Sequence, residues 1–405
     1  MVYLIYSLTD IIIGEVNVKN LKRYKHKIPE DFDQFIDEND LIKIEQYAVD
    51  KTRVSSLESI FAKILFMVII LYGLMPWLTE ILGQFNFVLA GLIFFAVPGL
   101  LGAISGLPFD YYHIFVIEKR YGFNTRTFKI WLSDLFKSLL ITVILGTFLL
   151  TLLLLMINFF GSMWWILAWI VFFLFQLLMT VLYPTVIAPM FNKFTPIQNE
   201  QLADKIRSLS TREGMIIKGL FQMDAKRRTR HTNAYITGLG KAKRIVFYDT
   251  LLEGHKEDEI LAVLAHEIGH LKGNHIKKQI LIMGFVFFIL FFLASRMITW
   301  ETMYHSFGFA RMPAHAGLFL VAVIWEPIGY FLSPLAMAIS RRFEREADRY
   351  SVMIMKTSEP LITALKKMVK DNLSNLRPHP LYIWFHYSHP PILKRIETLK
   401  KSPFS

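Results

Sequence analysis

Long blocks of apolar residues constrain the fold of this chain more than any other feature of its sequence. A helix needs about 20 predominantly apolar residues to cross the hydrocarbon core of a bilayer. The chain is 54% hydrophobic and only 19% charged over 405 residues, and the apolar excess is concentrated in these blocks. We therefore predict a mainly α-helical protein that crosses a membrane several times. The six clearest spans are residues 64–77, 87–107, 139–160, 163–190, 279–295 with 297–300, and 317–340.

A seventh span is predicted at residues 2–16, which gives about seven transmembrane helices. This block is short and contains Asp10 and Glu15, so the alternative is a helix that lies in the interface without crossing it. Of the 45 Lys and Arg residues, all but Arg296 and Arg311 fall in alternate loops of this map. Because basic loops stay in the cytoplasm, we expect the N-terminus outside and the C-terminus inside.

The same distribution accounts for the net charge of +12 through topology, so we expect a lipid bilayer and no nucleic acid as a partner. The sequence contains no cysteine. A disulfide scaffold, a thiol nucleophile and a Cys-ligated metal are therefore excluded, which leaves His, Asp and Glu as possible metal ligands.

The predicted organisation is one integrated unit of four segments. These are an N-terminal transmembrane region (1–190), a cytoplasmic catalytic segment (191–278), the last two spans (279–340) and a C-terminal cytoplasmic segment (341–405). Within the catalytic segment we expect a small α+β region similar to zincins: one helix at 198–212, strands at 216–223, 233–238 and 244–248, and a helix from Glu257 through His270 toward the next span. The basic turn at 226–230 is either a solvated loop or a contact with anionic lipid headgroups.

The motif that predicts chemistry is HExxH at residues 266–270. On a helix, His266 and His270 are four residues apart and face the same way, so both imidazoles can bind one metal ion. Glu267 lies beside the first ligand and can take a proton from a water that zinc activates. The alternative is two ordinary histidines on a helix.

A catalytic zinc needs a third protein ligand from another element, and we assign Glu344 to that role. Asp348 lies one turn later on the same helix face and can accept the second ring N–H of a ligating histidine. By itself this stretch is also typical of a charged helix start with i,i+4 pairs. Glu346 is expected to point elsewhere into solvent. His275 lies five residues after His270, on the wrong helical face for the same metal, and is left out of the site.

Together these motifs resemble the type I CAAX prenyl endopeptidases, membrane zinc proteases that remove the last three residues of prenylated proteins. Further segments are similar to that family at residues 115–124, 233–235, 243–252, 340–344 and 386–395. The resemblance implies seven helices around a water-filled chamber, with one Zn²⁺ at its cytosolic end. It gives Glu326 a place facing the chamber or paired with another polar group.

The resemblance also implies further roles for matching residues. Asn233 and Ala234 would lie on an edge strand that pairs with the substrate backbone. His389 and Arg395 would contact the reacting carbonyl or the C-terminal carboxylate of the substrate. Judged without the family, His389 is a capping residue before two prolines and Arg395 is a surface arginine.

Three functions remain open from the sequence. The first is a zinc endopeptidase that cuts near the C-terminus of prenylated CAAX-type or similar membrane-tethered substrates. The second keeps the chemistry but clears damaged membrane proteins, and the third is a transporter or scaffold with a structural metal site. The protein is expected in the inner membrane of a prokaryote or in the endoplasmic reticulum of a eukaryote, with its active site on the cytoplasmic side.

Overall fold

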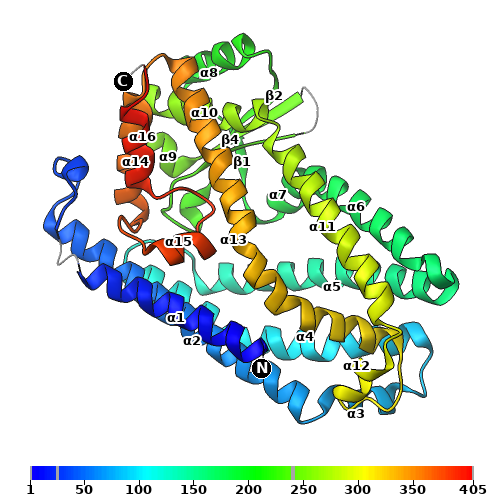
Figure 1. Cartoon of the computed structure of the whole chain (residues 1–405). Helices are drawn as coiled ribbons and strands as arrows, with labels where there is room; N and C mark the ends of the chain where they lie inside the picture. The colour runs from blue at the N-terminus through cyan, green and yellow to red at the C-terminus, as the bar shows by residue number, and fades with distance from the viewer. Residues whose placement is uncertain (1, 24–26, 239–241, 404–405) are drawn as a thin grey trace.

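The chain folds into long apolar helices beneath a smaller body that contains one sheet, as the computed structural model in Figure 1 shows. The structure describes residues 2–23, 27–238 and 242–403. The sheet, with α8 and α10, lies at the top of the view, and α3 and α12 lie at the opposite end. The ends of the long helices that lead into the sheet body therefore share one side of the molecule.

Among the described residues, six continuous helical stretches are long and apolar enough to cross a membrane, and they match the six clearest predicted spans. Inside a helix every backbone group is paired, which a bilayer interior requires. Side-chain caps begin three of them: Asp37 before α2, Asn86 before α4 and Thr127 before α5. Four of the six stretches are single helices: α2 (Glu38–Leu71), α5 (Phe128–Phe159), α11 (His275–Met297) and α13 (Ala314–Met355). The other two are composite: α4 (Phe87–Tyr112) continues into η2 (His113–Glu118), and η3 (Gly161–Met163) leads into α6 (Trp164–Leu182), η4 (Tyr183–Ile187) and α7 (Ala188–Phe191).

The N-terminal block forms α1 (Val2–Arg23), which has the length of a span but is not among the six stretches with a span's composition. Its Asp10 carboxylate accepts hydrogen bonds from Lys63 at 2.8 Å and Ser59 at 3.0 Å, both on α2. The acidic residue that weakened this block as a span is therefore paired across a helix contact. Short helices α3 (Leu74–Leu82) and α12 (Glu301–Ser306) share one apolar cluster at the far end of the molecule.

Residues 191–278 contain a four-stranded sheet in the order β1-β2-β4-β3. β2 and β4 are parallel, while β1 and β3 pair antiparallel at the two edges. The three predicted strands are confirmed, but β1 was missed because three residues ending in proline give no alternating pattern. The strands are β1 (Phe194–Pro196), β2 (Ile216–Met223), β3 (Ala234–Thr237) and β4 (Ala242–Tyr248), and the remaining elements before the motif helix are α8 (Glu200–Arg212), η5 (Ala225–Arg227) and α9 (Asp249–Gly254).

The motif helix α10 (Glu257–Lys272) packs between the sheet and two later helices, α13 and α14 (Glu359–Asn372). One apolar cluster joins α8, α10 and three strands, so the helix that carries HExxH is fixed on several sides. The predicted helix from Glu257 through His270 is confirmed, but it is not continuous with the next span. It ends at Lys272, and Asn274 takes a left-handed conformation with φ of 52° before α11 begins. The C-terminal helices are α15 (Pro380–His386) and α16 (Ile392–Lys400), and η1 (Glu30–Phe32) precedes α2.

Candidate metal centre

The site begins with the close crossing of α10 and α13. A Cβ atom added to Gly269 would lie 2.8 Å from the Cα of Ala347 and 3.0 Å from its carbonyl oxygen, so two small residues let the helix backbones approach. Glu344, Ala347 and Asp348 share one face of α13, since they are three and four residues apart. This crossing therefore points both acidic residues at the HExxH face of α10.

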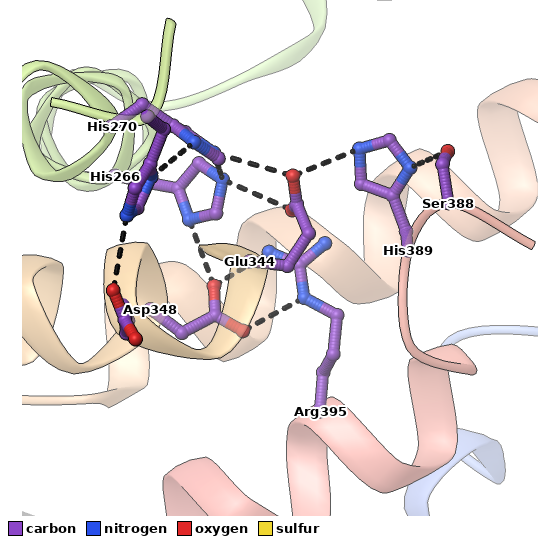
Figure 2. Close-up of polar contacts among 9 residues, drawn as sticks. His266, His270, Glu344, Asp348, Ser388, His389 and Arg395 are labelled. Carbon is purple, nitrogen blue, oxygen red and sulfur yellow. Dashed lines mark hydrogen bonds and ion pairs between the residues drawn. The ribbon is translucent and has the colours of Figure 1, made fainter. Parts of the chain in front are cut away.

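Three side chains from the two helices converge on one point, as Figure 2 shows. Nε2 of His266 lies 3.2 Å from Nε2 of His270 and 3.4 Å from Oε2 of Glu344. Nε2 of His270 lies 3.3 Å from Oε1 of Glu344. Zinc binds nitrogen and oxygen at about 2.0–2.2 Å, and tetrahedral angles then hold neighbouring ligand atoms about 3.4 Å apart. The three predicted ligands therefore have the spacing of one zinc site.

The donor set also fits a cation on electrostatic grounds. Oε2 of Glu344 is buried and faces Nε2 of His266 at 3.4 Å. Within the described chain, His266, His270 and Glu344 form the group of acidic or imidazole side chains whose ligand atoms are mutually within 4.8 Å. Two imidazoles and one carboxylate match the protein ligands of catalytic zinc sites, whose fourth position is taken by water or substrate.

Asp348 lies where the sequence predicted it, against the first histidine. Its Oδ1 is 2.8 Å from Nδ1 of His266, which leaves Nε2 free for the metal. Burial by itself lowers the pKa of His266, but the hydrogen bonds to Asp348 and Glu344 outweigh it and raise that pKa to about 9. A proton and a metal ion therefore compete for this imidazole.

His270 has an orienting partner that the sequence analysis excluded. Nδ1 of His275 lies 3.0 Å from Nδ1 of His270, and Nε2 of His275 lies 3.1 Å from Glu346. Glu346 lies outside the metal group, as expected, but it is only partly solvated, because it contacts His275 and accepts a hydrogen bond from Arg342 at 2.9 Å. His275 is absent from the metal group, as predicted, but the helix break at Asn274 returns its ring to the site.

Glu267, the glutamate of the HExxH motif, is partly exposed. Burial raises its pKa, while the neighbouring His266 and His270 oppose that shift. A carboxylate beside the metal ligands whose pKa is raised is suited to accept a proton and to release it again. Its place next to His266 and the direction of this pKa shift are compatible with the role of general base that the motif predicts.

The C-terminal segment brings two further predicted residues to the same point. His389 approaches Glu344 from the side opposite the two ligating histidines, with its Nε2 3.3 Å from Oε1. Ser388 contacts the other ring nitrogen at 2.9 Å. Arg395 binds both carboxylate oxygens of Asp348, at 2.9 Å through Nε and 2.6 Å through Nη2. Arg395 is therefore no surface arginine; it joins α16 to α13 behind the ligands.

Asn233 and Ala234 lie at the start of the edge strand β3, where the resemblance places them. The Asn233 carbonyl accepts a hydrogen bond from the Tyr248 N–H at 3.0 Å, which fixes the strand to β4. A cavity of about 760 Å³ is lined by Asn233, His389 and Arg395 together with parts of α2, α14 and α15. One open space therefore connects the edge strand with the C-terminal side of the metal site.

Glu326 in the last span has a polar partner, as one of its two expected placements requires. The Tyr6 hydroxyl of α1 donates a hydrogen bond to its Oε1 at 3.2 Å. This contact, like that of Asp10, attaches α1 to the other helices.

Two family profiles together match almost the whole chain. Residues 17–193 match a family profile described as CAAX prenyl protease N-terminal, five membrane helices, and residues 196–402 match the profile of peptidase family M48. Curated relatives include CAAX prenyl protease 1 homologues of Arabidopsis thaliana and Homo sapiens. The first is 34% identical over 88% of this chain and 86% of its own length. The second is 31% identical over 92% of this chain and 88% of its own length.

A solved structure has the same fold as this chain. The crystal structure of S. mikatae Ste24p superposes with a TM-score of 0.89, is 30% identical, and covers 98% of this chain and 99% of its own. These similarities do not favour the transporter or scaffold alternative.

Proposed function

The chain belongs to the M48 family of peptidases, as one of the CAAX prenyl protease type, and from that membership we propose that it cleaves near the C-terminus of prenylated or similarly membrane-tethered proteins. The family and function predicted from the sequence motifs are confirmed: the protein is a multi-span membrane metalloendopeptidase. The family implies a metal, and we assign one Zn²⁺ per chain to His266, His270 and Glu344. The observation that supports this assignment most is the 3.2–3.4 Å spacing of their ligand atoms.

A bound zinc ion would lower the pKa of a coordinated water to near 7 and polarise the substrate carbonyl. Glu267 would accept a proton from that water and return it to the leaving amine. Asp348 and His275 hold the two ligating imidazoles with their Nε2 atoms toward the metal. Glu267 therefore acts by moving a proton, whereas Asp348 and His275 act by orienting the ligating imidazoles.

The substrate backbone is proposed to pair with the edge strand β3, next to Asn233 and Ala234. An unpaired strand edge offers N–H and C=O groups to an extended peptide, so binding requires little side-chain specificity. His389 is placed to donate a hydrogen bond to the carbonyl oxygen that becomes negative during attack. Two nitrogens of Arg395 are engaged by Asp348, so its contact with a substrate carboxylate would use the remaining Nη1.

The alternating Lys and Arg distribution supports an active site on the cytoplasmic side of the membrane. A substrate with a lipid anchor at its C-terminus would enter from that same side. The water-filled chamber implied by the resemblance would admit one flexible chain at a time.

The experiment is cleavage of matched farnesylated and unmodified CAAX peptides by the detergent-purified full chain, with products identified by mass spectrometry. Release of the terminal tripeptide, faster from the farnesylated peptide, supports the proposal. Equal rates on both peptides would refute dependence on the prenyl group and favour the quality-control alternative. Glu267→Gln serves as the blank, because it keeps the shape of the side chain and removes the base.

A further inference from the structure

A second pocket lies where α5, α7 and the turn η5 meet, apart from the metal centre. Its volume is about 340 Å³, within the range of small-ligand sites in proteins. Lys129, Lys137, Lys193, Arg227 and Arg228 all line it. The peptidase chemistry has no use for a basic pocket at this position, so its charge needs a separate explanation.

Most of this positive charge has no acidic partner. Arg228 is neutralised, since its Nε and Nη2 bind the two oxygens of Asp134 at 2.8 and 2.9 Å. Lys137 donates to the carbonyl of Met190 at 2.8 Å, which leaves its charge uncompensated. In the parts of the chain that the structure describes, the exposed side chains of Lys129, Lys193 and Arg227 form no hydrogen bond or ion pair.

The uncompensated cations lie beside an exposed apolar stripe of α5, a helix long and apolar enough to cross a membrane. Lys129, Ser133 and Lys137 follow each other at intervals of four residues and form one stripe of α5. The neighbouring stripe of the same apolar helix is exposed and apolar: Leu132 is 51% exposed, Phe136 66% and Leu140 43%. A molecule with a phosphate group and acyl chains would match both stripes.

We propose that this pocket binds the phosphate of an anionic phospholipid, whose acyl chains lie along α5. The hydroxyl of Ser133 and the ammonium groups of Lys129 and Lys193 supply donors to phosphate oxygens, while Arg227 approaches from the turn. Free phosphate shares the headgroup chemistry but lacks the contact with the apolar stripe. Lipid is therefore the ligand that uses both features.

Binding would join the catalytic segment to the transmembrane helices at the membrane surface. Arg227 belongs to η5, and the chain continues from this turn to the edge strand β3. Two contacts hold the stretch between them against the loop after η2, a bridge between Thr229 and Asn124 and the hydrogen bond from Arg230 N–H to Phe123 O at 3.1 Å. A bound headgroup would stabilise the same stretch from the other side.

The test is titration of the detergent-purified full chain with a short-chain phosphatidic acid, followed by native mass spectrometry. Phosphatidylcholine and inorganic phosphate form the comparison arms. The variant combines Lys129→Gln, Lys193→Gln and Arg227→Gln. Its matched control combines Lys218→Gln, Lys277→Gln and Arg349→Gln, which removes the same charge from exposed residues that do not line the pocket.

Each basic residue near an anionic surface contributes roughly fivefold in affinity, so the pocket variant should bind the anionic lipid on the order of a hundredfold more weakly. The control should lose far less, and phosphatidylcholine should not compete. Equal losses in both variants would mean diffuse attraction and overturn the site. Competition by millimolar inorganic phosphate as strong as by the lipid would overturn the lipid as ligand. If the triple variant does not fold, Lys129→Gln and Lys193→Gln singly should each lose about fivefold.

Discussion

Replacing Gly269 by alanine tests whether the close crossing of α10 and α13 builds the metal site. The added Cβ would lie 2.8 Å from the Cα of Ala347 and 3.0 Å from the Cβ of Tyr350. Carbon atoms in contact prefer about 3.5–4.0 Å, so the helices would have to separate by roughly 0.7–1.2 Å. Two of the metal ligands are on α10 and the third is on α13, so the separation acts directly on the ligand spacing.

The expected loss of zinc binding and of activity follows from how little displacement metal ligands and catalytic groups tolerate. Metal–ligand distances vary by only about 0.2 Å around their ideal values, which is far less than the required separation. Misplacement of catalytic groups by about 1 Å costs on the order of a hundredfold in rate. We therefore expect Gly269→Ala to lower kcat/KM by about a hundredfold and to weaken zinc binding measurably.

The effect on stability has two opposing contributions. Alanine favours a helix over glycine by about 1 kcal/mol, whereas overpacking a tight contact costs about 1–3 kcal/mol. The expected net result is a lower melting temperature. Gly102→Ala is the matched control, because this helical glycine on α4 has no atom within 4 Å of the added Cβ. It should keep full activity.

The assay measures zinc content after dialysis against a weak chelator, together with peptide cleavage, for wild type and both variants. Gly269→Ala with the zinc content and activity of wild type would refute the reasoning, since the two backbones would then not set the site.

Three further outcomes are expected. Asp348→Asn removes the carboxylate from His266 and leaves the buried Arg395 unpaired, so zinc affinity should fall about 10–100-fold and melting should occur earlier; zinc titration and thermal unfolding check both. His275→Phe keeps the stacking on Phe343 but removes the nitrogen next to His270, so zinc affinity should fall about tenfold with little change in melting temperature; an unchanged affinity would contradict an orienting role. Because burial raises the pKa of Glu267, and the base works only when ionised, kcat should fall as pH decreases through a midpoint above the ordinary value of about 4.3; a pH–rate profile measured at saturating zinc checks the sign.

The sequence predicted the spans and the ligands because both depend on local pattern. Apolar length identifies a span without knowledge of its neighbours, and HExxH places two imidazoles on one helix face by periodicity alone. Glu344 could be assigned because its helix follows a span directly and repeats the i,i+4 spacing with Asp348.

Features that depend on contacts between distant elements could not be read from the sequence. His275 was excluded by assuming an uninterrupted helix, yet Gly273 and Asn274 directly precede it and are a typical signal for a helix end. The role of Gly269 cannot be inferred from the sequence, because it depends on the contact with Ala347 where α10 and α13 cross. The strand β1 is too short to show an alternating pattern and owes its place to pairing with β2.

Arg395 was expected to act on the substrate, but its position against Asp348 could not be inferred from α16 alone. An arginine on an amphipathic helix is usually exposed. Here Arg395 forms an ion pair with the buried carboxylate of Asp348, and the two side chains connect the C-terminal segment to α13.

The central claim is that one zinc ion held by His266, His270 and Glu344 works with Glu267 to hydrolyse a peptide bond. The most direct test measures zinc per chain and turnover on the same preparations of wild type and Glu267→Gln. We predict one zinc per chain in both proteins, and cleavage by wild type alone. Turnover by Glu267→Gln, or by wild type stripped of metal, would contradict the account.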